Sequence, residues 1–237
     1  STQVPFHVRR ILAPVLGLTE GRIRVIKPRI GAAFGNKQEI YEDIAAHLTI
    51  ATGRPVLFEL TREEQFIYTV TRHPMMVRYR IGVQKDGTMT AQDMYALSDT
   101  GAYGGHGLTV LGNTGHKTLP IYNTPAVRFY GDTVYTTTPR SGAYRGYGVT
   151  QGVIATETLI TQVAETLGMD PLEFRLKNII EPNTENIMSK AWSEGREAKG
   201  EMIVTNALRE AAAQGAAAMG WYEKYGNPGT ACHSGLP

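Results

Sequence analysis

The chain has 237 residues, of which 42% are hydrophobic and 19% charged, a composition typical of a globular protein with a sizeable core. Its formal net charge of +2 and its scattered basic residues give no electrostatic case for nucleic-acid binding. The single cysteine, Cys232, excludes an internal disulfide and any cage of cysteine thiolates around a metal or an iron–sulfur cluster. No apolar run approaches the roughly 18–20 residues of a membrane helix. No secretory signal peptide is visible, and a single free thiol makes the cytoplasm the expected compartment.

The first third of the chain mixes helical and extended patterns. In chain order, the pattern predicts a helix over residues 5–16, a strand over 22–27, a helix over 38–52 and a strand over 55–60. Pro14 is expected to end or kink the first helix, and Gly53 to close the second.

The middle of the chain has the pattern of a β-hairpin followed by a glycine-rich stretch. Two alternating runs over residues 77–83 and 89–97 flank the turn signature Asp86-Gly87. Residues 99–118 carry many glycines and are expected to form a long loop. Residues 127–136 read as another strand.

The last part is mainly helical. Residues 149–167 predict a long amphipathic helix closed by Gly168, and Asp170 with Pro171 marks the start of another. Residues 180–199 are expected to form a polar loop, residues 201–218 an alanine-rich helix and residues 226–237 an irregular tail. Helices and strands without a regular βαβ order indicate an α+β fold with mixed sheets and packed helices.

Two small-residue loops are the most informative motifs. Residues 31–39 (GAAFGNKQE, the first loop) and residues 143–151 (AYRGYGVTQ, the second loop) each carry a bulky aromatic and lead into a helical pattern. Glycine and alanine let backbone N–H groups approach a flat, anionic cofactor, and the aromatics could wall a pocket for a planar substrate.

These loops, with residues 52–56 and 72–74 between them, resemble the molybdenum-binding subunit of the xanthine dehydrogenase/aldehyde oxidase family of molybdenum hydroxylases. The first loop is similar to that family's G-G-x-F-G-x-K segment and the second to its A-[FY]-R-G-[FY]-G-x-x-Q segment. The resemblance implies a molybdopterin-binding region over residues 1–182, as one body or two α/β subdomains. Residues 183–225 would then begin the following segment, before the tail at 226–237.

The resemblance also implies which residues contact the cofactor: Ala33, Phe34, Gly35 and Arg145. The main chain of Phe34 and the guanidinium of Arg145 would lie near oxygen ligands of molybdenum, with no protein side chain bound directly to the metal. Ala32 and Ala33 stand where the family often has glycine, and alanine tolerates a positive φ poorly. The plainer alternative is a tight turn and a surface arginine.

Three residues match substrate-contacting positions: Gln38, Asn113 and Tyr147. Tyr147 matches an aromatic that stacks on the substrate. Gln38 replaces a glutamate, and Asn113 an arginine, of the purine-oxidising members, which argues against a xanthine pocket of the usual kind. The alternative is that these residues pack in the core or never touch substrate. Gly146, in a loop without cysteine, disfavours a copper-containing carbon monoxide dehydrogenase.

Other chemical groups carry weaker signals. His106 and His116 lack the spacing of a helical metal site, and His73 is expected to be structural. Residues 63–64, both glutamate, are expected in a solvated first helical turn. Cys232, beside a histidine, reads as a free thiol rather than a nucleophile because no third group orients the pair.

The resemblance implies a hydroxylase that uses water as oxygen source to oxidise an N-heteroaromatic compound or an aldehyde. The cofactor would be molybdenum–molybdopterin, potentially in its cytosine dinucleotide form. The partners would be the remainder of the molybdenum subunit, an iron–sulfur subunit with 2Fe-2S clusters and an FAD subunit. The family's general-base glutamate motif, Gly-x-Gly-Glu, is absent from this sequence. We therefore expect a fragment or split subunit that is inactive alone, with the base supplied from outside this chain.

Two alternatives stay open. One is a non-catalytic scaffold with the same fold, which substitution of Arg145 would distinguish. The other is a carbohydrate- or peptide-binding α+β domain whose glycine loops are only turns. The clustering of Phe34, Tyr144 and Tyr147 in the two loops favours the enzyme component over an open binding groove.

Overall fold

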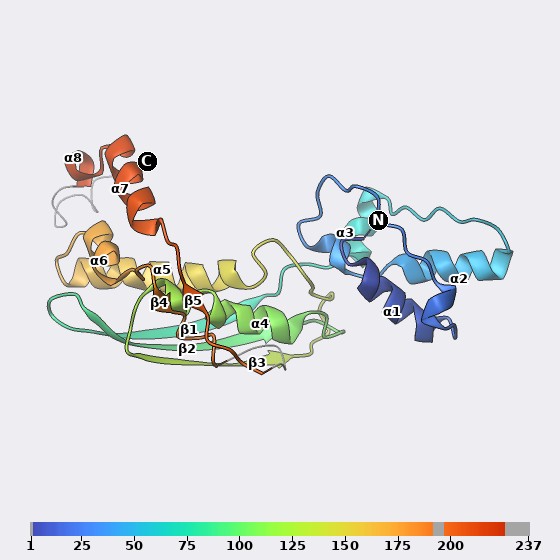
Figure 1. The fold of residues 1–237 in the computed structure, drawn as a ribbon, viewed down its shortest axis with the longest axis horizontal. Helices are drawn as coiled ribbons and strands as arrows, with labels where there is room; N and C mark the ends of the chain where they lie inside the picture. Colours follow the sequence, from blue (N-terminus) through green and yellow to red (C-terminus); the bar gives the residue numbers. More distant parts are fainter. Residues whose placement is uncertain (1, 192–196, 226–237) are drawn as a thin grey trace. The chain divides into compact units, whose positions relative to one another are not determined.

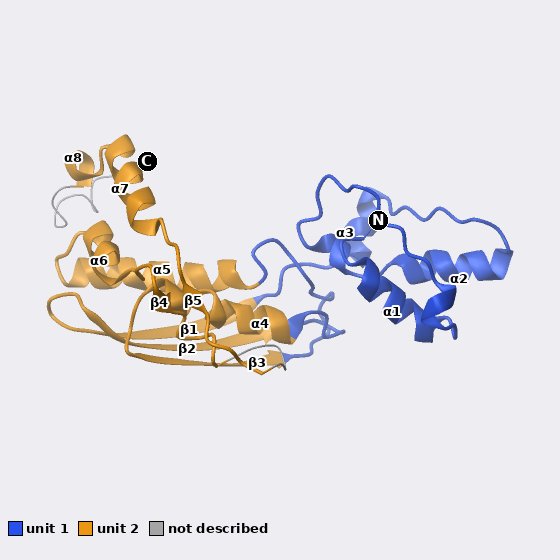
Figure 2. Cartoon of the chain, viewed as in Figure 1, with its two compact units in different colours: residues 1–74, 99–107, 134–147 blue, residues 75–98, 108–133, 148–237 orange. Residues whose placement is uncertain are grey.

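The computed structural model describes residues 2–191 and 197–225. The predicted tail and Cys232 lie outside these residues. The chain divides into two compact units (Figure 2). Unit 1 comprises residues 1–74, 99–107 and 134–147, and unit 2 comprises residues 75–98, 108–133 and 148–237.

Unit 1 is built from short helices and long connecting segments. Its elements are α1 (Pro5–Val15), η1 (Glu20–Arg22), η2 (Asn36–Gln38), α2 (Glu42–Thr52) and α3 (Arg62–Tyr68). The predicted first helix is confirmed, with Pro14 in its last turn. Gly53 closes α2 in the left-handed conformation, as predicted, with φ +64°. In α3, Thr61 and Glu64 form a reciprocal capping box, which confirms the predicted helical turn at residues 63–64.

Three predictions in unit 1 were wrong. The second helix begins at Glu42 rather than at residue 38, because a 3₁₀ turn and the extended Glu39 come first. Residues 22–27 and 55–60 form no strand in the described structure, although their hydrophobic alternation suggested one. Leu57 is 90% exposed. Alternation reports a local pattern, whereas a strand also needs a neighbour to complete its hydrogen-bond ladder.

Unit 2 is organised around a sheet of order β1-β2-β3 (Figure 1), with strands Met75–Val83, Met89–Asp99 and Ala126–Val134. β1 and β2 are antiparallel, and Tyr79 faces Met94 in their register. Gly87 takes φ +83° in the turn, and its N–H donates to Gln84 O at 2.9 Å. The predicted hairpin and third strand are confirmed.

The other elements of unit 2 are mainly helices. They comprise α4 (Gly107–His116), η3 (Leu119–Ile121), α5 (Val149–Thr166), α6 (Pro171–Asn178), β4 (Thr184–Glu185), β5 (Met202–Ile203), α7 (Leu208–Met219) and α8 (Trp221–Tyr225). Of these, α4 and η3 lie between β2 and β3 in the chain. The predicted α5 and the capped start of α6 are confirmed; Asp170 accepts from Leu172 N and Glu173 N.

The predicted loop over residues 99–118 was wrong in its second half, which is α4. Gly112 and Gly115 lower the helix propensity there, but Val110 and Leu111 are buried. Tertiary packing therefore outweighs local propensity. The alanine-rich helix also begins later than predicted, at Leu208, because β5 and a segment without regular structure precede it.

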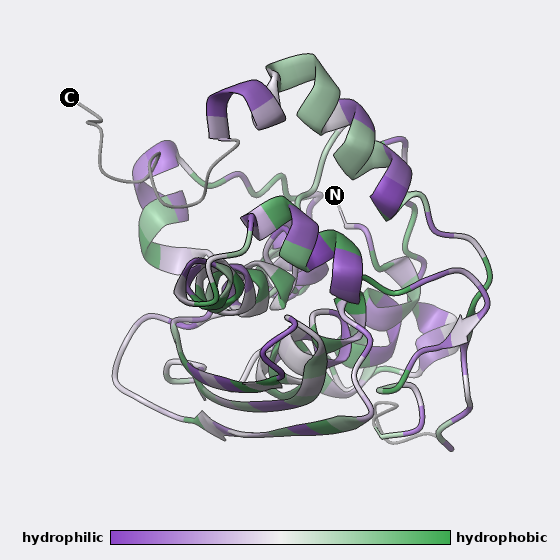
Figure 3. Ribbon diagram, turned by 90° about the vertical axis from the view of Figure 1, so that its left-hand side faces the viewer, coloured by the Kyte–Doolittle hydropathy of each residue, from purple (hydrophilic) through white to green (hydrophobic). Residues whose placement is uncertain are grey.

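Helices α4 and α5 cover one face of the sheet (Figure 1). One core cluster joins Met89 of β2 with Ile160 of α5 and Phe174 of α6. A second centres on Met94 and Leu119. Hydrophobic and hydrophilic residues alternate along the strands (Figure 3), as expected for a sheet covered on one face.

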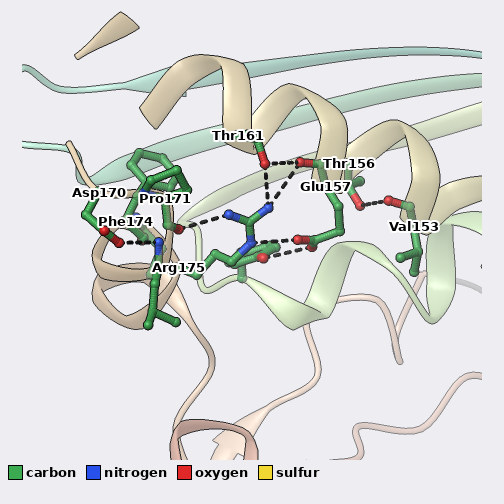
Figure 4. Close-up of polar contacts among 11 residues, drawn as sticks. Val153, Thr156, Glu157, Thr161, Asp170, Pro171, Phe174 and Arg175 are labelled. Carbon is green, nitrogen blue, oxygen red and sulfur yellow. Dashed lines mark hydrogen bonds and ion pairs between the residues drawn. The ribbon is translucent and has the colours of Figure 1, made fainter. Parts of the chain in front are cut away.

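A polar network joins α5 to α6 (Figure 4). Arg175 Nε donates to Glu157 Oε2 at 2.8 Å, and its Nη2 donates to Thr161 Oγ1 at 2.8 Å. Tyr122 O–H donates to the other oxygen of Glu157 at 2.7 Å. Burial, reinforced by this carboxylate, raises the pKa of Tyr122. The network holds α6 against the long helix that follows the second loop.

The predicted α+β class is confirmed by these elements. In the described part of the chain, no helix combines the length and hydropathy needed to span a bilayer.

Candidate cofactor and substrate site

Within unit 1 the backbones of the two loops are in direct contact. Gly35 has φ +96°, and a Cβ atom placed on it would lie 2.6 Å from Ala143 O and 2.9 Å from Tyr144 N. No real side chain tolerates such distances, so only glycine permits this approach. The two motifs, far apart in sequence, therefore form one continuous backbone surface.

Phe34 presents both its backbone and its ring at this surface. Its φ is +52°, a left-handed conformation that is uncommon for an aromatic residue, and it is 63% exposed. Asn36 N–H donates to Ala33 O at 3.1 Å, and Lys37 Nζ donates to Ala32 O at 2.8 Å, which closes the turn. Neither alanine has a positive φ. The alanines that replace glycine therefore introduce no such strain.

Arg145 lies beside Phe34. Its guanidinium carbon is 5.5 Å from the centroid of the Phe34 ring, and the residue is exposed. Among the described residues it forms no ion pair with a carboxylate. Arg72 holds the backbone of Arg145 in place. Its Nη2 donates to Arg145 O at 2.6 Å, and its guanidinium carbon lies 4.4 Å from the Tyr144 ring centroid. The site thus presents a positive charge on a backbone that is held in place.

A third segment, residues 101–107, completes the site within unit 1. His106 has φ +57°, and its Nδ1 lies 2.6 Å from the hydroxyl oxygen of Tyr147, which has φ +44°. His106 Nε2 lies 3.5 Å from Glu39 Oε1. Ala143 N–H donates to the same Glu39 oxygen at 3.4 Å. Glu39 therefore connects the end of the first loop with both other segments.

His73 holds the third segment in place through a contact with the Gly105 carbonyl. It is 1% exposed, and its Nε2 lies 3.1 Å from Gly105 O. Burial lowers the pKa of His73, which favours the neutral imidazole. The predicted structural role of His73 is confirmed.

The structure brings together the four residues matched to the cofactor, with Gln38 and Tyr147 in the same unit. Gln38 ends the 3₁₀ turn of the first loop, and its N–H donates to Gly35 O at 3.0 Å. Asn113 is different: it belongs to α4 in unit 2, and its amide donates to Thr109 O at 3.1 Å.

Sequence reasoning missed three residues of this site: Glu39, Arg72 and His106. Their signals were weak. Glu39 is the last residue of the first loop, Arg72 belongs to the segment between the loops, and His106 lies among glycines. Their roles depend on contacts across long sequence separations, which a single sequence does not reveal.

A family model matches most of the chain. Residues 1–179 match the family model described as the molybdopterin cofactor-binding domain. The chain belongs to this family.

The relatives of this molybdopterin cofactor-binding domain are molybdenum enzymes. The chain is 41% identical over 197 residues to the probable hypoxanthine oxidase XdhD of Escherichia coli, which covers 83% of the chain and 21% of that protein. It is 36% identical over 179 residues to the nicotinate dehydrogenase large molybdopterin subunit of Eubacterium barkeri, which covers 75% of the chain and 42% of that protein. The chain thus spans about a fifth of the length of XdhD.

Solved structures show the same fold. The aldehyde oxidoreductase of Desulfovibrio gigas matches with a TM-score of 0.77 and 31% identity, over 91% of this chain and 22% of that one. Quinoline 2-oxidoreductase of Pseudomonas putida matches with a TM-score of 0.78 and 27% identity, over 94% of this chain and 28% of that one.

The residues of this molybdopterin cofactor-binding domain fit an anionic, oxygen-rich group. The absence of a side chain at Gly35 lets the two loop backbones meet, and in the described structure the Phe34 N–H has no hydrogen-bond acceptor. Arg145, which has no carboxylate partner among the described residues, lies beside the Phe34 ring. A backbone N–H without an acceptor and a guanidinium on the adjacent loop are groups suited to bind oxygens that carry negative charge.

Proposed function

We propose that this chain forms one wall of the active site of a cytoplasmic molybdenum hydroxylase, with residues 1–182 as its molybdopterin-binding region. The overall reaction would be R–H + H₂O → R–OH + 2H⁺ + 2e⁻, on an N-heteroaromatic compound or an aldehyde. The electrons would pass to 2Fe-2S clusters and FAD in an iron–sulfur and an FAD partner. The pterin would be the cytosine dinucleotide form.

The observation that supports this proposal most strongly is the contact of the two loops at Gly35, with Arg145 beside Phe34. If the two loops were unrelated turns, nothing would require an aromatic residue in the left-handed conformation next to an arginine that has no carboxylate partner. The names of the relatives, which include a nicotinate dehydrogenase and an aldehyde oxidoreductase, support the class of substrate.

Each residue then has a defined part. Ala33, Phe34 and Gly35 offer backbone to the cofactor, and the Arg145 guanidinium stabilises negative charge on its oxygens. When bound, the cofactor supplies the oxidation chemistry; the protein binds, orients and excludes water.

The substrate would be oriented by three side chains. The amide of Gln38 would orient a ring nitrogen or carbonyl, the Tyr147 ring would stack on the planar substrate, and the Asn113 amide would also contact the substrate. The glutamate that acts as general base would come from outside this chain.

Arg145 provides the direct test. In the protein purified with its native partners, Arg145→Ala should lower kcat by about 10²-fold or more, because a preorganised charge is lost at the site. Arg145→Lys should be intermediate, since lysine keeps the charge but not the planar fork. Turnover and bound molybdenum are measured together.

The matched control is Arg62→Ala, an exposed arginine of α3 whose Nη1 donates to Gln65 Oε1 at 3.0 Å. It should leave kcat and molybdenum content unchanged. Wild-type turnover and metal content in Arg145→Ala would contradict the proposed role and favour a non-catalytic scaffold.

A further inference from the structure

The outer edge of β1 has no neighbouring strand in the described part of unit 2. β1 lies at one end of the sheet order β1-β2-β3 and pairs with β2. Among the described residues, the backbone groups of Met75–Val83 form no hydrogen bond outside that ladder. Natural proteins usually shorten, charge or cover such an edge, because its free N–H and C=O groups can pair with another strand. β1 is nine residues long, so its edge can accept an added strand.

A groove lies between β1 and α5, which pack against each other. Its volume is about 510 Å³, and alternate residues of β1 line one side: Met75, Val77 and Tyr79. On the other side it is lined by Ile154 of α5, which is 70% exposed. The Tyr79 hydroxyl donates to Gln92 Oε1 at 2.7 Å, so its hydrogen-bonding need is met within the unit. The groove therefore offers apolar surface next to an unpaired strand edge.

The other face of β1 carries positive charge. Arg78 and Arg80 alternate with the groove residues and are exposed. Arg80 contacts Asp93, which Arg128 also contacts, so one carboxylate serves two arginines. Arg78 forms no ion pair among the described residues. On a strand added at this edge, the residues of this face would lie beside arginines, where opposite charge stabilises the pairing.

We infer that the groove between β1 and α5 binds an extended segment of the remainder of the molybdenum subunit, in which apolar side chains alternate with carboxylates. The segment pairs with β1 as an added strand and places its apolar side chains in the groove. Its carboxylates lie beside Arg78 and Arg80. The inference rests on the proposed function only in that the chain is part of a longer molybdenum subunit.

Charge and connectivity favour this occupant over another chain. Edge-to-edge pairing of two copies would bring the arginines of one β1 beside those of the other, and like charges on neighbouring strands are destabilising. The chain spans 21% of XdhD, so most of that relative lies outside the matched region on the same polypeptide. A segment tethered in this way binds at a high effective concentration, an advantage that a separate partner chain lacks.

The first measurement is the binding of end-blocked, fluorescently labelled peptides of seven residues to the 237-residue chain, by fluorescence anisotropy. Val-Glu-Val-Glu-Val-Glu-Val should bind about tenfold more tightly than Val-Lys-Val-Lys-Val-Lys-Val, because its carboxylates lie beside two arginines. Val-Val-Glu-Glu-Val-Val-Glu has the same composition as the first peptide. It should bind at least about fivefold more weakly than that peptide, since its valines do not share one face of a strand.

Two variants change the surface without touching the core, because both positions are exposed. Arg78→Glu should reverse the preference, so that the lysine peptide binds more tightly than the glutamate peptide. Ile154→Glu should weaken binding of the glutamate peptide about tenfold, since it puts a carboxylate in the apolar groove. The matched controls are Arg62→Glu and Ile67→Glu, at exposed positions of α3 in unit 1. They should leave all three dissociation constants unchanged.

A second measurement identifies the occupant in the protein purified with its native partners. The photoreactive variant Ile154→benzoylphenylalanine should cross-link to a segment of the remaining molybdenum subunit. Mass spectrometry of the cross-linked peptide should show apolar residues that alternate with acidic ones. A cross-link to a second copy of this chain or to a separate partner chain, or no cross-link, would refute the assigned occupant.

Three results of the peptide titrations would overturn the inference: no binding of any peptide, equal affinity for the glutamate and lysine peptides, or a preference that Arg78→Glu leaves unchanged. Neither measurement depends on molybdenum or turnover. The expected peptide binding and cross-link in an assembly without molybdenum would therefore contradict the proposed function and not this inference.

Discussion

At the scale of single residues, the site depends on positions where the backbone takes an unusual conformation. Phe34, His106 and Tyr147 all have a positive φ without being glycine, and Gly35 has φ +96° against the backbone of Ala143. The sequence letters identify the two loops that carry Phe34, Gly35 and Tyr147. They do not identify His106 or Glu39 as members of the site, because those contacts bridge long sequence separations.

Substitution of Gly35 tests whether the two loop backbones meet as closely as the structure shows. Gly35→Ala should lower the free energy of unfolding by about 2 kcal/mol or more, because it adds both a clash with Ala143 O and left-handed strain. Urea denaturation measures the change. The control is Gly31→Ala in the same loop, whose added Cβ would meet nothing within 4 Å. Equal stability of the two variants would show that the loops do not meet as described.

At the scale of elements, the sequence predicted correctly those helices and turns that short-range signals specify. The hairpin at Gly87, the helix closed by Gly168 and the cap at Asp170 all follow from turn and capping chemistry. The sequence-based predictions were wrong where tertiary contacts determine the secondary structure. α4 forms despite its glycines because Val110 and Leu111 are buried, and residues 55–60 alternate in hydropathy but lack a neighbouring strand.

On the sheet, ion pairs between one carboxylate and two arginines are expected to make the stability of the fold depend on pH. Asp93 on β2 accepts from Arg128 Nε at 2.7 Å and from Arg80 Nε at 3.0 Å. These arginines hold the pKa of Asp93 well below its ordinary range. A carboxyl whose pKa is lower in the folded state stabilises the fold above its unfolded pKa, and this contribution is lost as pH falls through the folded value.

Asp93→Asn should therefore lower the free energy of unfolding at neutral pH and reduce its decline in acid. The effect should be small and weaken with added salt, because the arginines are exposed. Denaturant titrations across the acid range measure it. Asp132→Asn, on the neighbouring strand, is the control for removal of an exposed carboxylate. An unchanged acid dependence in Asp93→Asn would refute the assignment.

At the scale of the whole molecule, two motifs were enough to indicate the family, and the match over residues 1–179 shows it. The division into two units was not predictable from composition, since each unit draws on three separate stretches of the chain. The site residues of unit 1 come from all three of its stretches. A chain that spans about a fifth of its relative XdhD is expected to need the rest of the assembly for activity.

The most direct test of the central claim is the molybdenum and pterin content of the protein purified from its native host with whatever copurifies. We expect about one molybdenum and one pterin per chain, together with iron–sulfur and flavin partners. Loss of that molybdenum in Arg145→Ala, with Arg62→Ala unaffected, would locate the cofactor at the contact between the two loops. An intact assembly that holds neither molybdenum nor pterin would contradict the account and indicate a scaffold.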